Sequence, residues 1–309
     1  MEILTGIEDI GQDCAVAIGK FDGIHKGHRL IIEHITAMKK HGLKAVVFTF
    51  FPSPAAYFSK SEVKELYTAK EKREAFAKMG VDILIECPFD EKIASYDPKL
   101  FVKEVLCEKL HAKLICAGED VSFGKGGKGN LALLKEMSAE YDYHVHIIEK
   151  LKYNGKEISS TYIRELIAAG DMQAANDMLG NTFGITGMVV RGAHKGTGFG
   201  VPTVNLVAEQ GKLLPPDGVY VSTVKCGDKI YEGITNIGIK PTVSDLNIRG
   251  IETHLYECNE DLYDSYITVN LFCHLRKEMK FANVEELIKQ MEEDKETGRL
   301  LHEKRRMGQ

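Results

Sequence analysis

The first half of the chain is organised around Gly19-Lys20-Phe21-Asp22-Gly23-Ile24-His25-Lys26-Gly27-His28, which directly follows the apolar run Cys14–Ile18. A short apolar run of this kind predicts a buried strand. A helical pattern then extends from about His28 to His41 and is closed by Gly42. The stretch therefore links a buried strand to a helix, and its last residues form the helix N-terminus.

The same stretch offers a site for phosphate. The free N–H groups and the dipole at a helix N-terminus favour an anion. Glycines let the backbone approach closely, and two imidazoles can donate to phosphate oxygens from one face. The candidate nucleotide-binding residues are Gly19, Phe21, Gly23 and Gly27, and the candidate catalytic residues are His25 and His28. The alternative is a zinc pair or two surface histidines, although no third ligand lies nearby in the sequence.

Strand and helix patterns alternate through the rest of this half. Such alternation predicts a parallel sheet covered on both faces, with ligands at the carboxyl ends of the strands. Two helix starts carry cap signals, Thr68 with Glu71 and Asp97 with Pro98. The predicted strands are Cys14–Ile18, Lys44–Phe50, Val81–Glu86, Lys113–Ala117 and His144–Ile148, and a helix is expected around Leu131–Tyr141.

The pattern changes after a helical stretch, Tyr162–Leu179, that is interrupted at Gly170-Asp171 and ends in Gly180. Short β-branched runs at hairpin spacing then predict a small antiparallel barrel or sandwich. A final helix begins near Asn283, with one apolar face of Val284, Leu287, Ile288 and Met291. We expect domains at residues 1–182 and 183–309. The predicted strands are Ile185–Arg191, Val219–Cys226, Lys229–Ile234, Ile251–Glu257 and Tyr266–Leu275, with a two-residue turn at Gly227-Asp228.

Bulk composition limits the class of protein. The 309 residues are 44% hydrophobic and 28% charged, as in a globular protein, and the net charge of −5 gives no electrostatic case for a nucleic-acid partner. No apolar run reaches the roughly 18 residues of a membrane span, and the N-terminus lacks a secretory signal pattern. Seven scattered cysteines without a C-x-x-C pair favour buried thiols in the cytoplasm. Composition predicts no oligomeric state.

A second polar motif, Ile158-Ser159-Ser160-Thr161-Tyr162-Ile163-Arg164, lies at a helix start. Hydroxyls and free N–H groups of Ser159, Ser160 and Thr161 can hold phosphate there. Arg164, one turn into the helix, can pair with a triphosphate as a planar cation. The alternative is an ordinary Ser/Thr cap beside a solvated arginine.

A third motif occupies the second half, from Gly192 to Leu206. Its glycines, Gly196, Gly198 and Gly200 among them, suit a loop that folds over phosphates. Thr203 and Asn205 alternate with apolar residues as on a strand. Their oxygens suit Mg²⁺, which keeps most of its waters and bridges phosphates. The alternative is a glycine-rich turn with a purely architectural role.

These motifs together resemble the bacterial FAD synthetase family. Phe21-Asp22-Gly23-Ile24-His25-Lys26-Gly27-His28 resembles its H-x-G-H nucleotidyltransferase signature, which also occurs in cytidylyltransferases and class I aminoacyl-tRNA synthetases. The stretch from Gly118 to Gly124 and the Ile158–Arg164 motif resemble further family segments. Gly198–Leu206 resembles the riboflavin kinase module that usually follows. Other kinase-like segments are Gly218–Tyr220, Asn236–Gly238, Lys240–Thr242, Ile251–His254, Asp261–Tyr263 and Arg276–Phe281.

The resemblance implies a Rossmann-like α/β domain of the nucleotidyltransferase type, then a small antiparallel β-barrel with a C-terminal helix. It implies that riboflavin is phosphorylated with MgATP, and that AMP from a second ATP is joined to FMN to give FAD and pyrophosphate. His25, His28 and Arg164 would stabilise charge on the α-phosphate. Thr203 and Asn205 would hold Mg²⁺ and ATP, and Glu252 would act as the base. Asp120, Pro52 and Pro54 would contact the flavin.

The chain departs from the family pattern at a few positions. Ser53 stands in a P-S-P segment where the family has P-H-P, and Val121 replaces an aromatic residue. Thr197 stands where the glycine-rich loop usually has arginine, and Asp264 replaces a glycine. The alternatives are therefore an adenylyltransferase whose kinase half is inactive or regulatory, a non-enzymatic flavin or nucleotide sensor, and a different phosphorylated acceptor.

Overall fold

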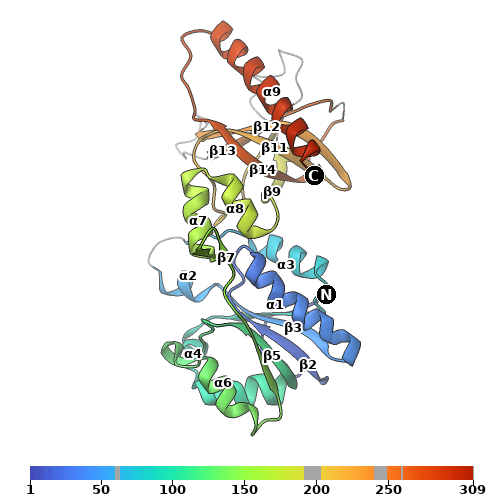
Figure 1. Ribbon diagram of the computed structural model, residues 1–309, viewed down its shortest axis with the longest axis vertical. Helices are drawn as coiled ribbons and strands as arrows, with labels where there is room; N and C mark the ends of the chain where they lie inside the picture. The colour runs from blue at the N-terminus through green and yellow to red at the C-terminus, as the bar shows by residue number, and fades with distance from the viewer. Residues whose placement is uncertain (60–62, 191–202, 240–248, 259, 309) are drawn as a thin grey trace. The chain divides into compact units, whose positions relative to one another are not determined.

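The computed structural model in Figure 1 describes residues 1–59, 63–190, 203–239, 249–258 and 260–308. The chain forms two compact units, Met1–Ser160 and Thr161–Gln309. The two units divide after Ser160, whereas the sequence predicts a domain boundary after residue 182. That domain boundary stays a prediction. Each unit has a sheet of its own.

A six-stranded sheet forms the centre of the first unit. Its order is β1-β4-β3-β2-β5-β6, and all neighbouring strands run parallel. The chain moves from β2 outward through β3 to β4 and then returns to the other side of β2 as β5, so the order reverses beside β2. The predicted parallel sheet is confirmed. Its strands are β1 (Glu2–Leu4), β2 (Cys14–Ile18), β3 (Lys44–Phe51), β4 (Ile83–Pro88), β5 (Ala112–Gly118) and β6 (His144–Ile148).

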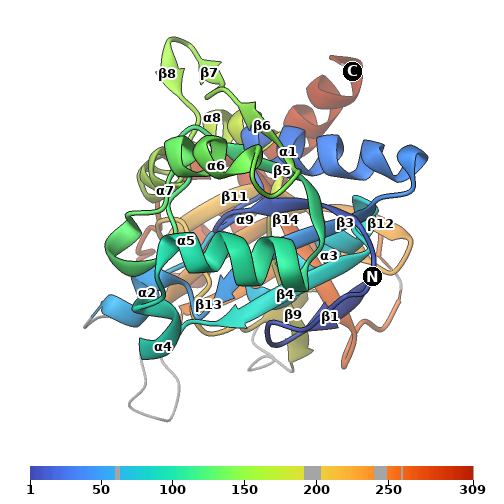
Figure 2. The ribbon, with the colours of Figure 1, turned by 90° about the horizontal axis from the view of Figure 1, so that it is seen from below.

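Helices cover both faces of this sheet, as Figures 1 and 2 show. Every residue of β2 is buried, because successive side chains point to opposite faces and both faces are packed. Cys14 and Val16 pack with η2 and α6, while α1 covers the opposite face with Ile31, Ile32 and Ile35. The helices are α1 (Lys26–Ala37), α2 (Pro54–Phe58), α3 (Ala69–Lys78), α4 (Glu91–Ala94), α5 (Pro98–Leu100), π-helical η2 (Phe101–Lys109), α6 (Leu131–Ser138), and the 3-10 turns η1 (Met38–His41) and η3 (Lys125–Gly127).

Local cap signals are confirmed where the sequence predicts them. Thr68 and Glu71 form a reciprocal capping box at the start of α3. Asp97 accepts from the backbone N–H groups of Lys99 and Leu100, at 2.9 and 3.1 Å, before α5. Each cap satisfies backbone donors that a helix start leaves unpaired.

A closed barrel forms the centre of the second unit. Its six strands follow the order β10-β13-β12-β11-β14-β9, and neighbouring strands are antiparallel. Helices α7 (Ser160–Ala169) and α8 (Met172–Leu179) precede it, and Gly227-Asp228 makes the predicted two-residue turn. The strands are β9 (Phe183–Val190), β10 (Thr203–Leu206), β11 (Gly218–Cys226), β12 (Lys229–Ile239), β13 (Arg249–Leu255) and β14 (Tyr266–Arg276), and a small hairpin of the first unit pairs β7 (Lys152–Tyr153) with β8 (Lys156–Glu157).

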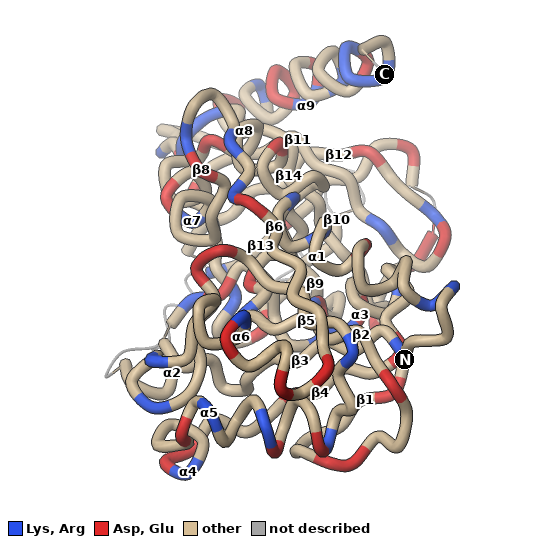
Figure 3. Tube along the Cα trace, turned by 60° about the horizontal axis from the view of Figure 1, so that its bottom comes forward, with Lys and Arg blue, Asp and Glu red and all other residues tan. Residues whose placement is uncertain are grey.

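Helix α9 (Val284–Met307) begins at the predicted cap, Asn283, but does not bury the predicted apolar face. Val284, Leu287 and Met291 are exposed, and the buried residues of the helix are Asp294, Gly298 and His302. The helix is anchored by a polar contact instead. Arg276 of β14 donates to the buried Asp294 carboxylate, with Nε–Oδ1 and Nη2–Oδ2 distances of 2.9 and 2.6 Å. Figure 3 shows basic residues gathered at the C-terminal end of α9, which suits the helix dipole.

We expect Asp294→Asn to destabilise the barrel unit by about 3 kcal/mol, because it leaves the Arg276 guanidinium without its ionic partner. Glu296→Gln removes an exposed carboxylate from the same helix and serves as the control. Thermal unfolding, monitored through limited proteolysis of α9, compares the two variants. Equal unfolding temperatures for both would contradict the anchoring role.

Candidate active site

The loop between β2 and α1 has an unusual backbone. Phe21 and Ile24 adopt positive φ angles of 49° and 41°, and Gly23 adopts 80°. A left-handed conformation costs a non-glycine residue about 1–2 kcal/mol. Both non-glycine side chains are fully buried, which offsets that cost. Strain held in place by packing is typical of functional loops.

The glycines of the loop make room for its own rings. A Cβ at Gly19 would lie 3.0 Å from the Phe21 ring, and one at Gly27 would lie 3.3 Å from the His25 ring. Gly23 supplies the left-handed turn instead. A side chain at Gly19 or Gly27 would therefore crowd the rings of the loop. The approach of these glycines to a phosphate stays a prediction.

The two histidines lie against each other. Their rings are stacked with centroids 3.6 Å apart and an interplanar angle of 16°. His25 is the N-cap of α1, and its Nδ1 accepts from the backbone N–H of His28 at 3.3 Å. Since Nδ1 is the acceptor, a neutral His25 carries its proton on Nε2. His28 Nδ1 is buried and has no hydrogen-bond partner in the described part of the chain.

Burial keeps both imidazoles neutral near neutral pH. It lowers the pKa of His25 to about 4, against a smaller opposing effect of Asp120. It also holds the pKa of His28 well below its ordinary value, with further lowering by His25 and Lys72. The pair therefore offers N–H donors rather than positive charge.

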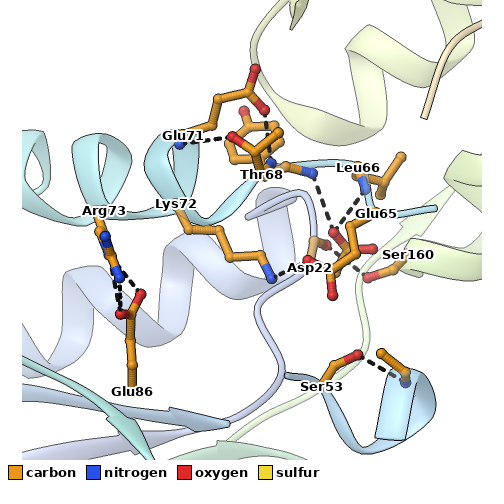
Figure 4. A network of polar contacts seen from close by, with 12 residues as sticks. Asp22, Ser53, Glu65, Leu66, Thr68, Glu71, Lys72, Arg73, Glu86 and Ser160 are labelled. Carbon is orange, nitrogen blue, oxygen red and sulfur yellow. Dashed lines mark hydrogen bonds and ion pairs between the residues drawn. The ribbon is translucent and has the colours of Figure 1, made fainter. Parts of the chain in front are cut away.

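A buried acid holds the loop in place (Figure 4). The Asp22 carboxylate accepts from the backbone N–H groups of Leu66 and Tyr67, at 2.9 and 3.3 Å, and Ser160 Oγ donates to the Asp22 carbonyl at 2.8 Å. Ser160 is thus a brace for the loop. Sequence reasoning assigned Asp22 no role, although an acid inside a glycine-rich loop was a usable signal.

The other predicted residues of the Ile158–Arg164 motif lie along the start of helix α7. Ser159 immediately precedes the helix, Thr161 follows Ser160, and Arg164 lies one turn further on. Thr161 and Arg164 belong to the second compact unit. Their roles toward phosphate stay predictions.

The predicted flavin residues Pro52 and Pro54 flank Ser53, whose hydroxyl caps helix α2 by accepting from the Ala56 N–H at 3.3 Å. Serine at this position thus has a local structural role. Asp120 follows β5, and its Oδ2 lies 3.7 Å from Lys150 Nζ. The fold brings Pro52 and Asp120 to strand ends at the same edge of the parallel sheet.

An exposed aromatic cluster beside Pro54 was missed by sequence reasoning. Tyr57, Phe58 and Phe89 contact one another edge to face, with centroids 5.1 to 5.7 Å apart, and Phe50 contacts Phe89 at 5.2 Å. Phe58 is 68% exposed. Large aromatic surface left in water at the carboxyl ends of strands indicates a ligand site. Its signal was the density of aromatic residues around Pro52 and Pro54.

The barrel places the second set of polar residues on one face. In β10, Val204 and Leu206 are buried, so Thr203 and Asn205 point the other way. Asn205 lies opposite Glu252 of β13, and cross-strand partners share a face. Asn236 of β12 lies opposite Glu252 on its other side. Sequence reasoning gave Asn236 no role, although an amide within a β-branched strand could have indicated one.

The remaining predicted residues lie in the second half of the chain. Gly196, Gly198 and Gly200, with Thr197 between them, lie outside the described residues. Asp264 adopts a left-handed φ of 57°. Aspartate tolerates this conformation better than most residues, so it can replace the glycine that the family pattern has there.

Family models match both halves of the chain. The FAD synthetase model matches residues 7–162, and the riboflavin kinase model matches residues 179–301. The chain belongs to the bifunctional riboflavin kinase/FMN adenylyltransferase family. A family member from Escherichia coli K12 is 32% identical over 306 residues, covering 97% of each chain. One from Bacillus subtilis is 34% identical over 288 residues, covering 91% of this chain and 90% of its own.

A solved structure supports the same fold over the whole length. It is named as a macrolide-efflux protein from Streptococcus pneumoniae, and it is 29% identical with a TM-score of 0.86, covering 97% of this chain and 99% of its own. That name describes the pneumococcal protein. Within the described residues of this family member, no helix combines the length and apolarity needed to cross a membrane.

The low pKa of His25 predicts a pH dependence of stability. Its folded value of about 4 lies below the ordinary 6.5, so the unfolded state binds a proton first as pH falls. Stability should therefore drop from pH 6.5 toward 4, by up to about 3 kcal/mol from this residue. His25→Asn keeps an N-cap acceptor but cannot titrate, and should flatten the drop.

Urea unfolding at a series of pH values measures this effect, with His144→Asn, at an exposed position, as the control. If the free energy of unfolding falls equally steeply with falling pH in His25→Asn and in the control, His25 is not the source of the pH dependence.

Proposed function

We propose that this protein makes FAD from riboflavin in two ATP-dependent steps. The observation that supports this most directly is the stacked pair of neutral imidazoles at the N-terminus of α1, beside the reversal point of a parallel sheet. A family model for each activity matches the corresponding half of the chain. ATP, riboflavin and FMN are the small-molecule substrates, and FAD and pyrophosphate are the final products.

In the adenylyl transfer, a phosphate oxygen of FMN attacks the α-phosphorus of ATP and pyrophosphate leaves. The FMN phosphate is already ionised near neutral pH, so no base is required. His25 and His28 donate N–H groups to oxygens that gain charge in the transition state, where preorganised donors act most strongly. Arg164 supplies a cation for the triphosphate. The backbone N–H groups of Gly23 to Gly27 supplement these donors.

In the kinase step, the ribityl hydroxyl oxygen attacks the γ-phosphorus of ATP, the bond from that phosphorus to the β–γ bridging oxygen breaks, and ADP leaves. Glu252 takes the proton from the attacking hydroxyl. Thr203 and Asn205 lie on the same face as Glu252, and their side-chain oxygens are the hard donors that Mg²⁺ prefers. Mg²⁺ held by these two residues would neutralise phosphate charge. The protein positions the hydroxyl and accepts its proton, which are the main requirements of phosphoryl transfer.

We place these reactions in the cytoplasm, with neither nucleic acid nor membrane as a partner. All seven cysteines are free thiols, as expected in a reducing compartment. The net charge of −5 offers no general attraction to a polyanion.

Separate substitutions should separate the two activities. We expect His28→Ala to lower FAD formation from FMN by about 100-fold or more, since it removes a transition-state donor. Glu252→Gln should lower FMN formation from riboflavin by about 100- to 10,000-fold. Each variant should retain the other reaction.

Chromatography of products from riboflavin plus MgATP, run beside FMN plus MgATP, measures both reactions. If the unaltered protein forms FAD from FMN plus MgATP but forms no FMN or FAD from riboflavin plus MgATP, the kinase half is inactive. Formation of neither product would leave a flavin or nucleotide sensor as the better description.

The aromatic cluster should bind the flavin ring. We expect Phe58→Ala to raise KM for FMN about 10-fold, because base-like rings gain roughly 1–3 kcal/mol from aromatic stacking, and to leave KM for ATP unchanged. Tyr263→Ala serves as the control, since Tyr263 lies in the barrel unit. An equal rise in KM for FMN and for ATP in Phe58→Ala would show that the aromatic cluster does not bind the flavin ring.

A further inference from the structure

Lys150 joins three segments of the first unit at the carboxyl edge of its sheet. It follows β6, and its Nζ lies 3.0 Å from Glu157 Oε2 and 3.7 Å from Asp120 Oδ2. Its backbone N–H donates to Glu119 Oε2 at 3.2 Å. The acids come from the loop after β5 and from the β7–β8 hairpin. One lysine therefore contacts three carboxylates through its side chain and its backbone.

The Asp120 carboxylate lies close to the histidine loop. Strands β5 and β2 are parallel neighbours, so the chain leaves both of them at the same edge of the sheet. A Cβ at Gly118 would lie 3.3 Å from Asp120 Oδ1, so this carboxylate lies against the end of β5. Burial lowers the pKa of His25, and the charge of Asp120 partly opposes that effect. Asp120 is therefore within electrostatic range of the site proposed for the phosphates.

An acid at this place has opposite effects on the two ends of FMN. The FMN phosphate is an anion, and an unpaired carboxylate nearby would repel it. The ribityl hydroxyls and the ring N–H of a flavin need acceptors, which a carboxylate supplies. A lysine on one side of the carboxylate offsets its charge and leaves other lone pairs of Asp120 available to accept.

We infer that Lys150 is a positioning residue for FMN in the adenylyl-transfer site: it orients the Asp120 carboxylate at the end of β5 and offsets its charge, so that this acid accepts from the flavin without repelling the phosphate. This inference rests on the proposed function. It assigns Lys150 an action through Asp120 rather than on the reacting atoms.

The exposure of the pair separates this role from a role in folding. The side chains of Lys150 and Asp120 are 38% and 76% exposed. An ion pair this open to water adds little to stability. It still changes the potential that an approaching anion meets, because that potential sums over all charges along the rim of a site. The effect of Lys150 is therefore expected in substrate binding.

The second acid partner of Lys150 anchors a different segment. Glu157 ends β8, three residues before Ser160, whose hydroxyl donates to the Asp22 carbonyl at 2.8 Å. The Lys150–Glu157 contact ties the hairpin to the end of β6, whereas the Lys150–Asp120 contact places a charge beside the histidine loop. Neutralising each acid alone distinguishes the two contacts.

The test compares Lys150→Met with Lys150→Arg and Glu157→Gln, and it combines Lys150→Met with Asp120→Asn. Methionine removes the charge, arginine keeps it, and asparagine keeps an acceptor without a charge. Lys152→Met is the control, since Lys152 is exposed on the same hairpin and its loss changes the net charge equally. KM for FMN and kcat of FAD formation are measured at low and at high ionic strength.

Lys150→Met should raise KM for FMN about 10-fold at low ionic strength, as expected for the loss of one partly screened charge. It should leave kcat unchanged, because binding is lost equally before and in the transition state. High salt should shrink the rise, since it screens exposed charges. Adding Asp120→Asn should restore KM, because the acid then needs no counter-ion. Lys150→Arg, Glu157→Gln and Lys152→Met should match the unaltered protein.

An equal rise in KM for FMN in Lys152→Met would overturn the inference, because net charge alone would then explain the effect. The same rise in Glu157→Gln would overturn it as well, since the hairpin contact would then be the cause. A rise in Lys150→Met that persists after Asp120→Asn is added would show that Lys150 does not act through Asp120.

Calorimetric titration with FMN measures binding to the same variants without catalysis. If the unaltered protein makes no FAD from FMN plus MgATP, the proposed function fails, and FMN affinity then decides the role of Lys150. Weaker binding in Lys150→Met that Asp120→Asn restores supports that role, and unchanged binding overturns it. Lys150 belongs to the first unit and Glu252 to the second, so FMN held by the kinase half contributes equally in every variant.

Discussion

Helix α1 starts after a short loop that follows a fully buried strand, and its first backbone N–H groups need acceptors. His25 meets part of that need by accepting from the His28 N–H, and this single hydrogen bond determines how the ring faces. His28 then stacks against it, and Gly27 has to be small where the His25 ring lies. The strained backbone at Phe21 and Ile24 follows from the same turn, which the buried side chains hold in place.

The two sites are built by different means. The first depends on a loop whose conformation is braced from outside by Leu66, Tyr67 and Ser160, all far from it in the sequence. In the described part of the second site, Asn205, Glu252 and Asn236 share a face through the register of antiparallel strands. A strand-based site tolerates changes in neighbouring loops better, because backbone hydrogen bonds position its side chains.

Local signals made much of the fold predictable. Thr68 with Glu71, Asp97 with Pro98, and Asn283 all cap helices where the sequence indicates, because a cap depends on residues only two or three apart. The buried face of α9 was not predictable in this way, since it depends on where Arg276 meets Asp294. The role of Asp22 also depends on partners 44 and 45 residues away, and no periodic pattern records such contacts.

The neutrality of the two imidazoles has a consequence for nucleotide binding. Neither His25 nor His28 can balance the charge of a triphosphate while burial lowers its pKa. Charge balance has to come from cations elsewhere, and Arg164 is the predicted one in the motif that follows the sheet. Hydrogen-bond donors that carry no charge of their own favour the transition state through geometry, because they need no counter-ion before the nucleotide arrives. A permanently charged pair in this buried loop would instead require a buried acid, and the one acid inside the loop, Asp22, already accepts from two backbone N–H groups.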